Sequence, residues 1–92
     1  MDKKEEELLE KSVEELTLLL LYLTGWEEEV LKGSKIIRSW KGYSFEVLNA
    51  LEEKGLISQS KKAKSVYLTG DGHKKAKELF QKYLDLENNP LA

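Results

Sequence analysis

The chain has 92 residues, 40% of them hydrophobic and 35% charged, which suffices for one buried core and excludes two. It contains no cysteine, so disulfides are excluded and a reducing, cytoplasmic location is expected. The longest apolar run, residues 18–23, is far shorter than the roughly 20 residues that span a bilayer, so we expect no membrane contact.

Charge is distributed unevenly along the chain. Residues 1–29 carry ten acidic groups against three lysines, whereas residues 30–92 carry twelve basic groups against seven acidic ones. A basic surface therefore belongs to the second part of the chain, and the acidic leader opposes strong attraction to nucleic acid or a membrane.

The first long helix is predicted to start at Ser12. Residues 1–11 are mostly charged and predict a solvated, frayed helical leader, whereas Ser12 and Glu15 have the spacing of a capping box. The positions expected on one apolar face are Val13, Leu16, Leu19, Leu20 and Leu23. Leu18 and Leu21 widen this face, so the helix is either central or in contact with a second subunit.

The next segment has the weakest pattern. Gly25 is expected to end the first helix in a left-handed conformation, and the spacing of Thr24 and Glu27 is again that of a capping box. A Gly-Ser pair interrupts the apolar pattern, so we expect a short, broken helix over residues 27–39. A turn is predicted at residues 40–43.

Residues 44–69 are predicted to form a helix followed by a β-hairpin. Ser44 is a suitable N-cap, and Gly55 is a suitable terminator for the helix. Its inward positions are expected to be Phe45, Leu48 and Leu51. Residues 56–59 and 65–69 predict the two strands, joined by a lysine-rich tip.

The last predicted helix is capped by Thr69 or Asp71. Its apolar stripe consists of Ala76, Leu79, Phe80, Tyr83 and Leu86, and residues 88–90 supply the stop. The predicted fold is mainly α with a small β-hairpin wing, in the order helix, short broken helix, helix, β-hairpin, helix. We expect one domain over residues 12–87, preceded by the leader 1–11 and followed by a tail, 88–92.

Two motifs in the second half of the chain resemble part of a known domain. The motif LxxLEEKGLI of residues 48–57 and the motif VYLTxxG of residues 66–72 resemble the C-terminal half of a bacterial winged helix-turn-helix domain. The stretch that begins RSWKGYSFEVL at Arg38 and runs to Thr69 also resembles a family of small bacterial proteins catalogued as a domain of unknown function, over residues 15–85. The first resemblance implies a winged helix; the second implies no activity.

The winged-helix resemblance implies a DNA-recognition helix over residues 44–54, with the wing on the DNA backbone. The outward candidates there include Ser44 and Asn49, of which Asn49 suits bidentate pairing to adenine. This helix differs from a typical DNA-recognition helix because three of its side chains would repel phosphates: Glu46, Glu52 and Glu53.

Lysines supply the strongest signal for nucleic-acid contact. Lys61, Lys62 and Lys64 form an acid-free wing tip that suits phosphates, and Arg38 and Lys41 would extend the basic surface. The alternative is a lysine-rich turn that keeps the hairpin soluble and unpaired, with Arg38 and Lys41 as ordinary solvated charges.

For the remaining aromatic and titratable residues, a structural role is favoured over a catalytic one. Trp40 and Tyr43 could stack on a base or anchor a partner, but core packing is the favoured interpretation, as for Trp26. His73 is the single histidine and is expected to be solvent-exposed, without partners for a metal site. We predict no catalytic residue, metal or cofactor, and therefore no enzyme.

The first functional hypothesis is a DNA-associated transcriptional regulator that binds as a homodimer through a basic wing. Its interface would join the first and last helices, with Leu18, Leu21 and Tyr83 as candidates. The alternative is a protein-interaction module without nucleic-acid binding, docking through the leucine face or the Trp40–Tyr43 corner. A small-molecule sensor with a pocket under the first helix is a third possibility.

Overall fold

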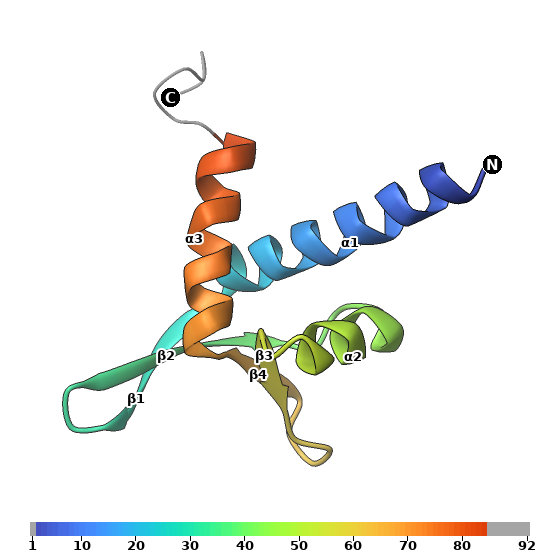
Figure 1. Ribbon diagram of the computed structural model, residues 1–92. Helices are drawn as coiled ribbons and strands as arrows, with labels where there is room; N and C mark the ends of the chain where they lie inside the picture. Colours follow the sequence, from blue (N-terminus) through green and yellow to red (C-terminus); the bar gives the residue numbers. More distant parts are fainter. Residues whose placement is uncertain (1, 85–92) are drawn as a thin grey trace.

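The computed structural model describes residues 2–84, which form three helices and one four-stranded sheet (Figure 1). In chain order the elements are α1 (Lys3–Thr24), β1 (Trp26–Leu31), β2 (Ser34–Trp40), α2 (Phe45–Glu53), β3 (Ile57–Gln59), β4 (Ser65–Leu68) and α3 (Gly70–Leu84). The mixed α+β class is confirmed, whereas the winged-helix arrangement is not. The predictions for Leu86, the stop at residues 88–90, the domain end at 87 and the tail 88–92 lie outside the described residues.

The sheet is antiparallel throughout, with strand order β1-β2-β4-β3. Trp26 pairs with Arg38, Arg38 with Tyr67, and Tyr67 with Ser58, so one row of residues crosses all four strands. Paired residues point to the same face of a sheet and neighbours along a strand to opposite faces. Because Val66 lies next to Tyr67 and is buried in the core, this row faces away from the helices.

Residues 27–39 form β-strands, and the predicted broken helix is wrong. The β1 and β2 strands make a hairpin whose turn contains Gly33 at φ 82°, a conformation that glycine adopts without strain. Gly25 ends α1 at φ −80°, an extended and not a left-handed conformation. Glycine is needed there because a Cβ atom would lie 2.7 Å from the carbonyl oxygens of both Leu21 and Arg38.

The α1 helix starts at Lys3, ahead of the predicted start at Ser12. Asp2 is the N-cap, and its Oδ1 accepts a hydrogen bond from the Glu5 amide at 2.8 Å. The leader is thus continuous with the first helix. Residues 3–11 are exposed on every side, and Figure 1 shows this end of α1 projecting beyond the other elements.

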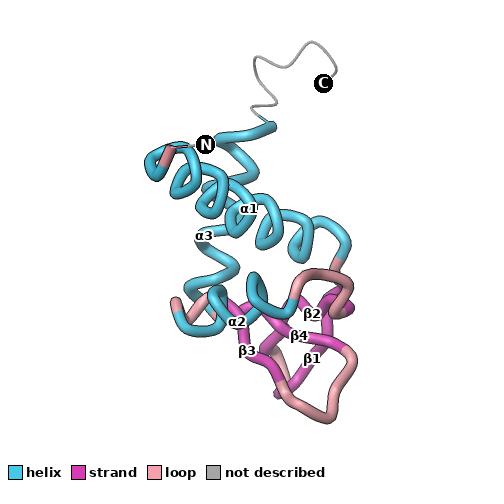
Figure 2. The backbone as a smooth tube through the Cα atoms, turned by 90° about the vertical axis from the view of Figure 1, so that its right-hand side faces the viewer, coloured by secondary structure: helices cyan, strands magenta, loops and turns pink. Residues whose placement is uncertain are grey.

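The core lies between the three helices and the inner face of the sheet. Figure 2 shows α1 crossing above α2 and the strands. The buried apolar side chains are Leu18, Leu19, Leu21, Leu48, Leu51, Ile57, Val66, Leu68, Ala76 and Leu79. Every element except β1 and β2 contributes at least one of them, and Ile37 of β2 packs against their edge.

The second half of the chain follows the sequence prediction closely. Gly55, at φ 74°, terminates α2. Thr69 Oγ1 accepts a hydrogen bond from the Gly72 amide at 3.0 Å, and this bond caps α3. Ser44 is the N-cap residue of α2. Phe45 was expected to point inward, but it is 74% exposed.

Candidate interaction surfaces

An apolar stripe runs along the outward face of α1. It consists of five side chains that are 42–50% exposed: Leu9, Val13, Leu16, Leu20 and Leu23. Their separations alternate between four and three residues, the 3.5-residue period of a coiled-coil seam. We call these residues the α1 stripe, and they form the face of α1 that its own domain leaves open.

Leu18 and Leu21 do not belong to this open face. They are 1% and 0% exposed and pack in the core, so they are not available to a second subunit. Val13, Leu16, Leu20 and Leu23, which the sequence placed on one apolar face together with Leu19, are exposed, whereas Leu19 is buried. Tyr83, the third interface candidate, is an exposed residue of α3, with the Lys82 Nζ 5.1 Å from its ring centroid.

Two ion pairs fasten the middle of α1 to the other helices. Glu14 pairs with Lys54 at the end of α2, and Glu15 with Lys82 of α3 at 3.3 Å. The hydrogen bond to Glu15, reinforced by the charge of the same carboxylate, raises the pKa of Lys82 above its ordinary value. The middle of α1 is therefore held on both sides, in contrast to its exposed first turns.

A groove between α1 and α2 adjoins the α1 stripe. Its volume is about 410 Å³, and Leu9 and Val13 of the stripe line it together with Val47 and Ala50 of α2. Its acidic lining residues are Glu10, Glu14 and Glu46. The groove therefore extends the apolar surface of the stripe sideways onto α2.

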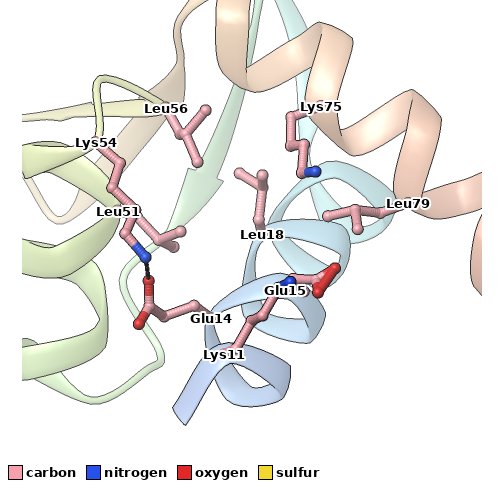
Figure 3. A pocket seen from close by; sticks show the side chains of 9 residues that line it. All are labelled: Lys11, Glu14, Glu15, Leu18, Leu51, Lys54, Leu56, Lys75 and Leu79. Carbon is pink, nitrogen blue, oxygen red and sulfur yellow. Dashed lines mark hydrogen bonds and ion pairs between the residues drawn. The ribbon is translucent and has the colours of Figure 1, made fainter. Parts of the chain in front are cut away.

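A smaller pocket lies where the three helices meet (Figure 3). Leu18, Leu51, Leu56 and Leu79 converge on it, and its volume is about 130 Å³. Small-molecule sites commonly measure about 300–1,000 Å³, so the volume of this pocket lies below that range. The lysines and glutamates at its rim are long side chains that cover the apolar surface beneath them.

The structure gathers four lysines at one corner of the sheet. The Lys41 amide donates to the Lys64 carbonyl at 2.9 Å, and the Lys41 Nζ donates to the Ser60 carbonyl at 2.8 Å. These bonds tie the end of β2 to the β3–β4 tip that carries Lys61 and Lys62. We call Lys41, Lys61, Lys62 and Lys64 the lysine corner.

Arg38 is engaged within the sheet. Its Nε donates to Glu28 at 2.7 Å, its Nη1 donates to the Ser65 hydroxyl at 3.3 Å, and its guanidinium lies 5.7 Å from the Tyr67 ring centroid. It therefore orders the outer face of the sheet, and its charge is already compensated by Glu28.

The α2 candidates are not part of the lysine corner's hydrogen-bond network. Asn49 Oδ1 accepts a hydrogen bond from Gln59 Nε2 at 3.1 Å, and Glu52 accepts one from the Gln59 amide at 2.8 Å. This bond engages the side-chain oxygen that bidentate pairing to a base would use. Ser44 is exposed beside Phe45 at the start of α2.

Two tryptophans, Trp26 and Trp40, lie together on the outer face of the sheet next to the lysine corner. Trp40 is 63% exposed, so its predicted place in the core is wrong, and its ring centroid lies 5.0 Å from that of Trp26. Tyr43 does pack against the core, and the ring of His73, half-buried where exposure was expected, lies 5.5 Å from that of Tyr22.

Within residues 2–84, no group of histidine, cysteine, aspartate or glutamate side chains is placed to hold a metal ion. Over the same residues, no helix combines the length and apolar character needed to cross a membrane. The features with a clear chemical character are therefore the α1 stripe and the lysine corner with its neighbouring aromatic rings.

The chain resembles proteins whose role is not defined. It is 32% identical over 77 residues to the uncharacterized protein y4hR of Sinorhizobium fredii, covering 83% of this chain and 93% of the relative. No solved structure gives a significant match. Residues 9–86 match a family described as a domain of unknown function. On this match, the chain belongs to the DUF6429 family.

Proposed function

We propose that this protein is a small interaction module that forms a homodimer through the α1 stripe. The observation that carries the proposal is the 3.5-residue spacing of five half-exposed apolar side chains on one helix. Isolated exposed leucines are common on monomers, but a continuous stripe at this period fits a second helix.

Charge favours an antiparallel pairing of the two α1 helices. Residues 2–10 carry five acidic groups and two lysines, so a parallel pair would place two acidic segments side by side. An antiparallel pair about a two-fold axis near Leu16 separates these segments. Each then approaches the C-terminal half of the partner's α1, which packs beside the lysine-bearing helix α3.

The exposed first turns of α1 also fit this arrangement. A helix of nine residues with little tertiary packing is marginal in water, and residues 3–11 contain the exposed Leu8 and Leu9. In an antiparallel dimer this segment lies across the partner and buries Leu9 there. The dimer thereby supplies the packing that the single chain does not give these turns.

Recognition of a DNA duplex has less support than the interaction module. A loop, and not a helix, leads directly from β2 into α2, and the exposed side of α2 carries Glu46, Glu52 and Glu53. These carboxylates would face phosphates in a major groove. The DNA-associated regulator stays a prediction from the sequence, and the interaction module is the function that the exposed surfaces favour.

Sedimentation velocity over a micromolar concentration series tests the proposal. The native protein is expected to form a dimer, and Leu16→Glu is expected to be monomeric because it places a charge at the centre of the α1 stripe. Leu16 is 42% exposed, so the variant keeps the core intact and its thermal unfolding should change little.

Val30→Glu is the matched control, because Val30 is 49% exposed on the β1 strand, away from the stripe. It should dimerise like the native protein. A native protein that stays monomeric throughout the series, or a Leu16→Glu variant that dimerises as well as Val30→Glu, would rule out the α1 stripe as the interface.

A further inference from the structure

We infer that the outer face of the sheet, together with the lysine corner, binds single-stranded nucleic acid. This site is separate from the α1 stripe, and its ligand chemistry is an unpaired base stacked on an exposed ring with its phosphates at lysines. The observations are the exposed rings, the clustering of the lysines and the distribution of acidic residues around them.

The rings lie where bases can reach them. Trp40 and Arg38 are two residues apart on β2, so both point to the face of the sheet that turns away from the helices, where Arg38 also meets Tyr67. Trp26 supports Trp40 from β1 through the ring contact of 5.0 Å. Trp40, 63% exposed as a residue and backed by Trp26, thus offers an open aromatic surface, as a stacking platform requires.

The lysine corner starts at the residue after Trp40. Lys41 follows Trp40 directly, and the backbone partner of Trp40 across the sheet is Ser65, which adjoins Lys64. The hydrogen bonds from Lys41 to the carbonyls of Lys64 and Ser60 hold both sides of the corner together. A chain with one base on Trp40 would therefore place its neighbouring phosphates near these lysines.

Acidic residues are absent from the two segments that build this site. Residues 30–45 contain four basic groups and no acid, and residues 54–70 contain four lysines and no acid. The nearby carboxylates come from other elements: Glu28 is paired with Arg38, Glu52 holds the Gln59 amide, and Glu46 lies in the first turn of α2. The two segments therefore carry an excess of positive charge although the whole chain has a formal net charge of −2.

The exposed rings favour single strands over a duplex. In a duplex the bases are stacked on one another, so their faces cannot reach Trp40, whereas an unpaired strand presents them. The lysine corner by itself would contact either form through phosphates. Discrimination between the two forms therefore depends on the rings, and overall affinity depends on the lysines.

Fluorescence anisotropy with four labelled probes of equal length tests the inference: oligo(dT), oligo(U), a DNA duplex and an RNA duplex. The native protein should bind the single strands more tightly than the duplexes, and the two single-stranded arms show which sugar it prefers. Four lysine contacts predict a slope of log affinity against log salt of about −3. Trp40→Ala should weaken single-strand binding about tenfold and leave duplex binding unchanged.

Charge variants supply the matched comparison. Lys61→Gln/Lys62→Gln/Lys64→Gln should reduce the size of the salt slope by about 2. Lys74→Gln/Lys75→Gln/Lys77→Gln removes the same charge from α3 and should bind like the native protein. Leu31→Ala, at a residue 72% exposed on β1, controls for loss of an exposed apolar side chain.

Three results would overturn the inference. The first is no binding of either single strand at tens of micromolar protein in low salt. The second is an equal loss in the two triple-lysine variants, which would show attraction to general charge. The third is duplex binding as tight as single-strand binding with no effect of Trp40→Ala, which would show backbone contact without stacking.

Discussion

At the scale of single residues, Gly72 shows how closely α3 approaches the end of α2. A Cβ atom at Gly72 would lie 1.7 Å from the Leu56 carbonyl oxygen, which belongs to the backbone and cannot rotate away. Gly72→Ala should therefore lower the free energy of unfolding by about 3 kcal/mol. Urea denaturation followed by circular dichroism measures the change.

Gly70→Ala is the control for this substitution. Gly70 also lies in the first turn of α3, but nothing lies within 4 Å of a Cβ atom there. The free energy of unfolding should stay the same or rise by about 0.5–1 kcal/mol, because alanine restricts the unfolded chain. Equal destabilisation by the two substitutions would contradict the close contact of Gly72 with Leu56.

Residue spacing predicted the helices better than it predicted which leucines they bury. The run of leucines in α1 fits two opposite faces, and the sequence does not say which one meets the core. The structure buries Leu18 and Leu21 and exposes Leu16 and Leu20. Trp40 was misplaced for a similar reason, since its size favours burial on average but its position at the end of β2 leaves it outside the core.

At the scale of elements, the second half of the fold was predictable because each boundary has a local chemical cause. Gly55 and Thr69 set the ends of α2 and α3 through a left-handed backbone and a side-chain cap. The β1–β2 hairpin was missed because the spacing of Thr24 and Glu27 imitates a capping box. Its β-branched residues and a glycine at the turn were the available signal.

The same reasoning explains the missed start of α1. Asp2 caps the helix through its bond from the Glu5 amide, and acidic residues in the first turn, Glu5 and Glu6, interact favourably with the helix dipole. The charged composition suggested a frayed leader, whereas cap and dipole together favour continuation of the helix. Its stability in solution then depends on what covers its apolar side chains.

Amide hydrogen exchange tests how the first turns of α1 are stabilised. Residues 3–11 should be protected in the native dimer and should exchange on the order of tenfold faster in Leu16→Glu, because the variant loses the partner helix. Exchange in α2 should be equal in the two proteins. Equal rates for residues 3–11 in both would mean that these turns gain nothing from a second copy.

At the scale of the whole molecule, the two proposed surfaces lie on different parts of the fold. The α1 stripe lies on the outward side of the longest helix, whereas the lysine corner lies at the end of the sheet. A dimer through α1 would therefore leave two lysine corners open. Two weak single-strand sites in one particle can bind one long strand more tightly than either site alone, provided that the strand spans both.

Neither surface was visible as a whole in the sequence. The lysines at 61, 62 and 64 are neighbours in the chain, but the link from Lys41 to the hairpin tip depends on the pairing of β2 with β4. The predicted helix over residues 27–39 concealed that pairing. Burial and sheet register, which arise only from tertiary packing, were the missing information.

Disulfide trapping tests the antiparallel α1 pairing most directly, because the native chain contains no cysteine. Leu9→Cys and Leu23→Cys stand at the two ends of the α1 stripe, and a disulfide requires Cα atoms about 4.4–6.8 Å apart. Mixing the two variants under mild oxidation should give a covalent heterodimer, with little covalent dimer from either variant alone. Efficient crosslinking of Leu9→Cys with itself, or no covalent dimer from the mixture, would contradict the antiparallel dimer.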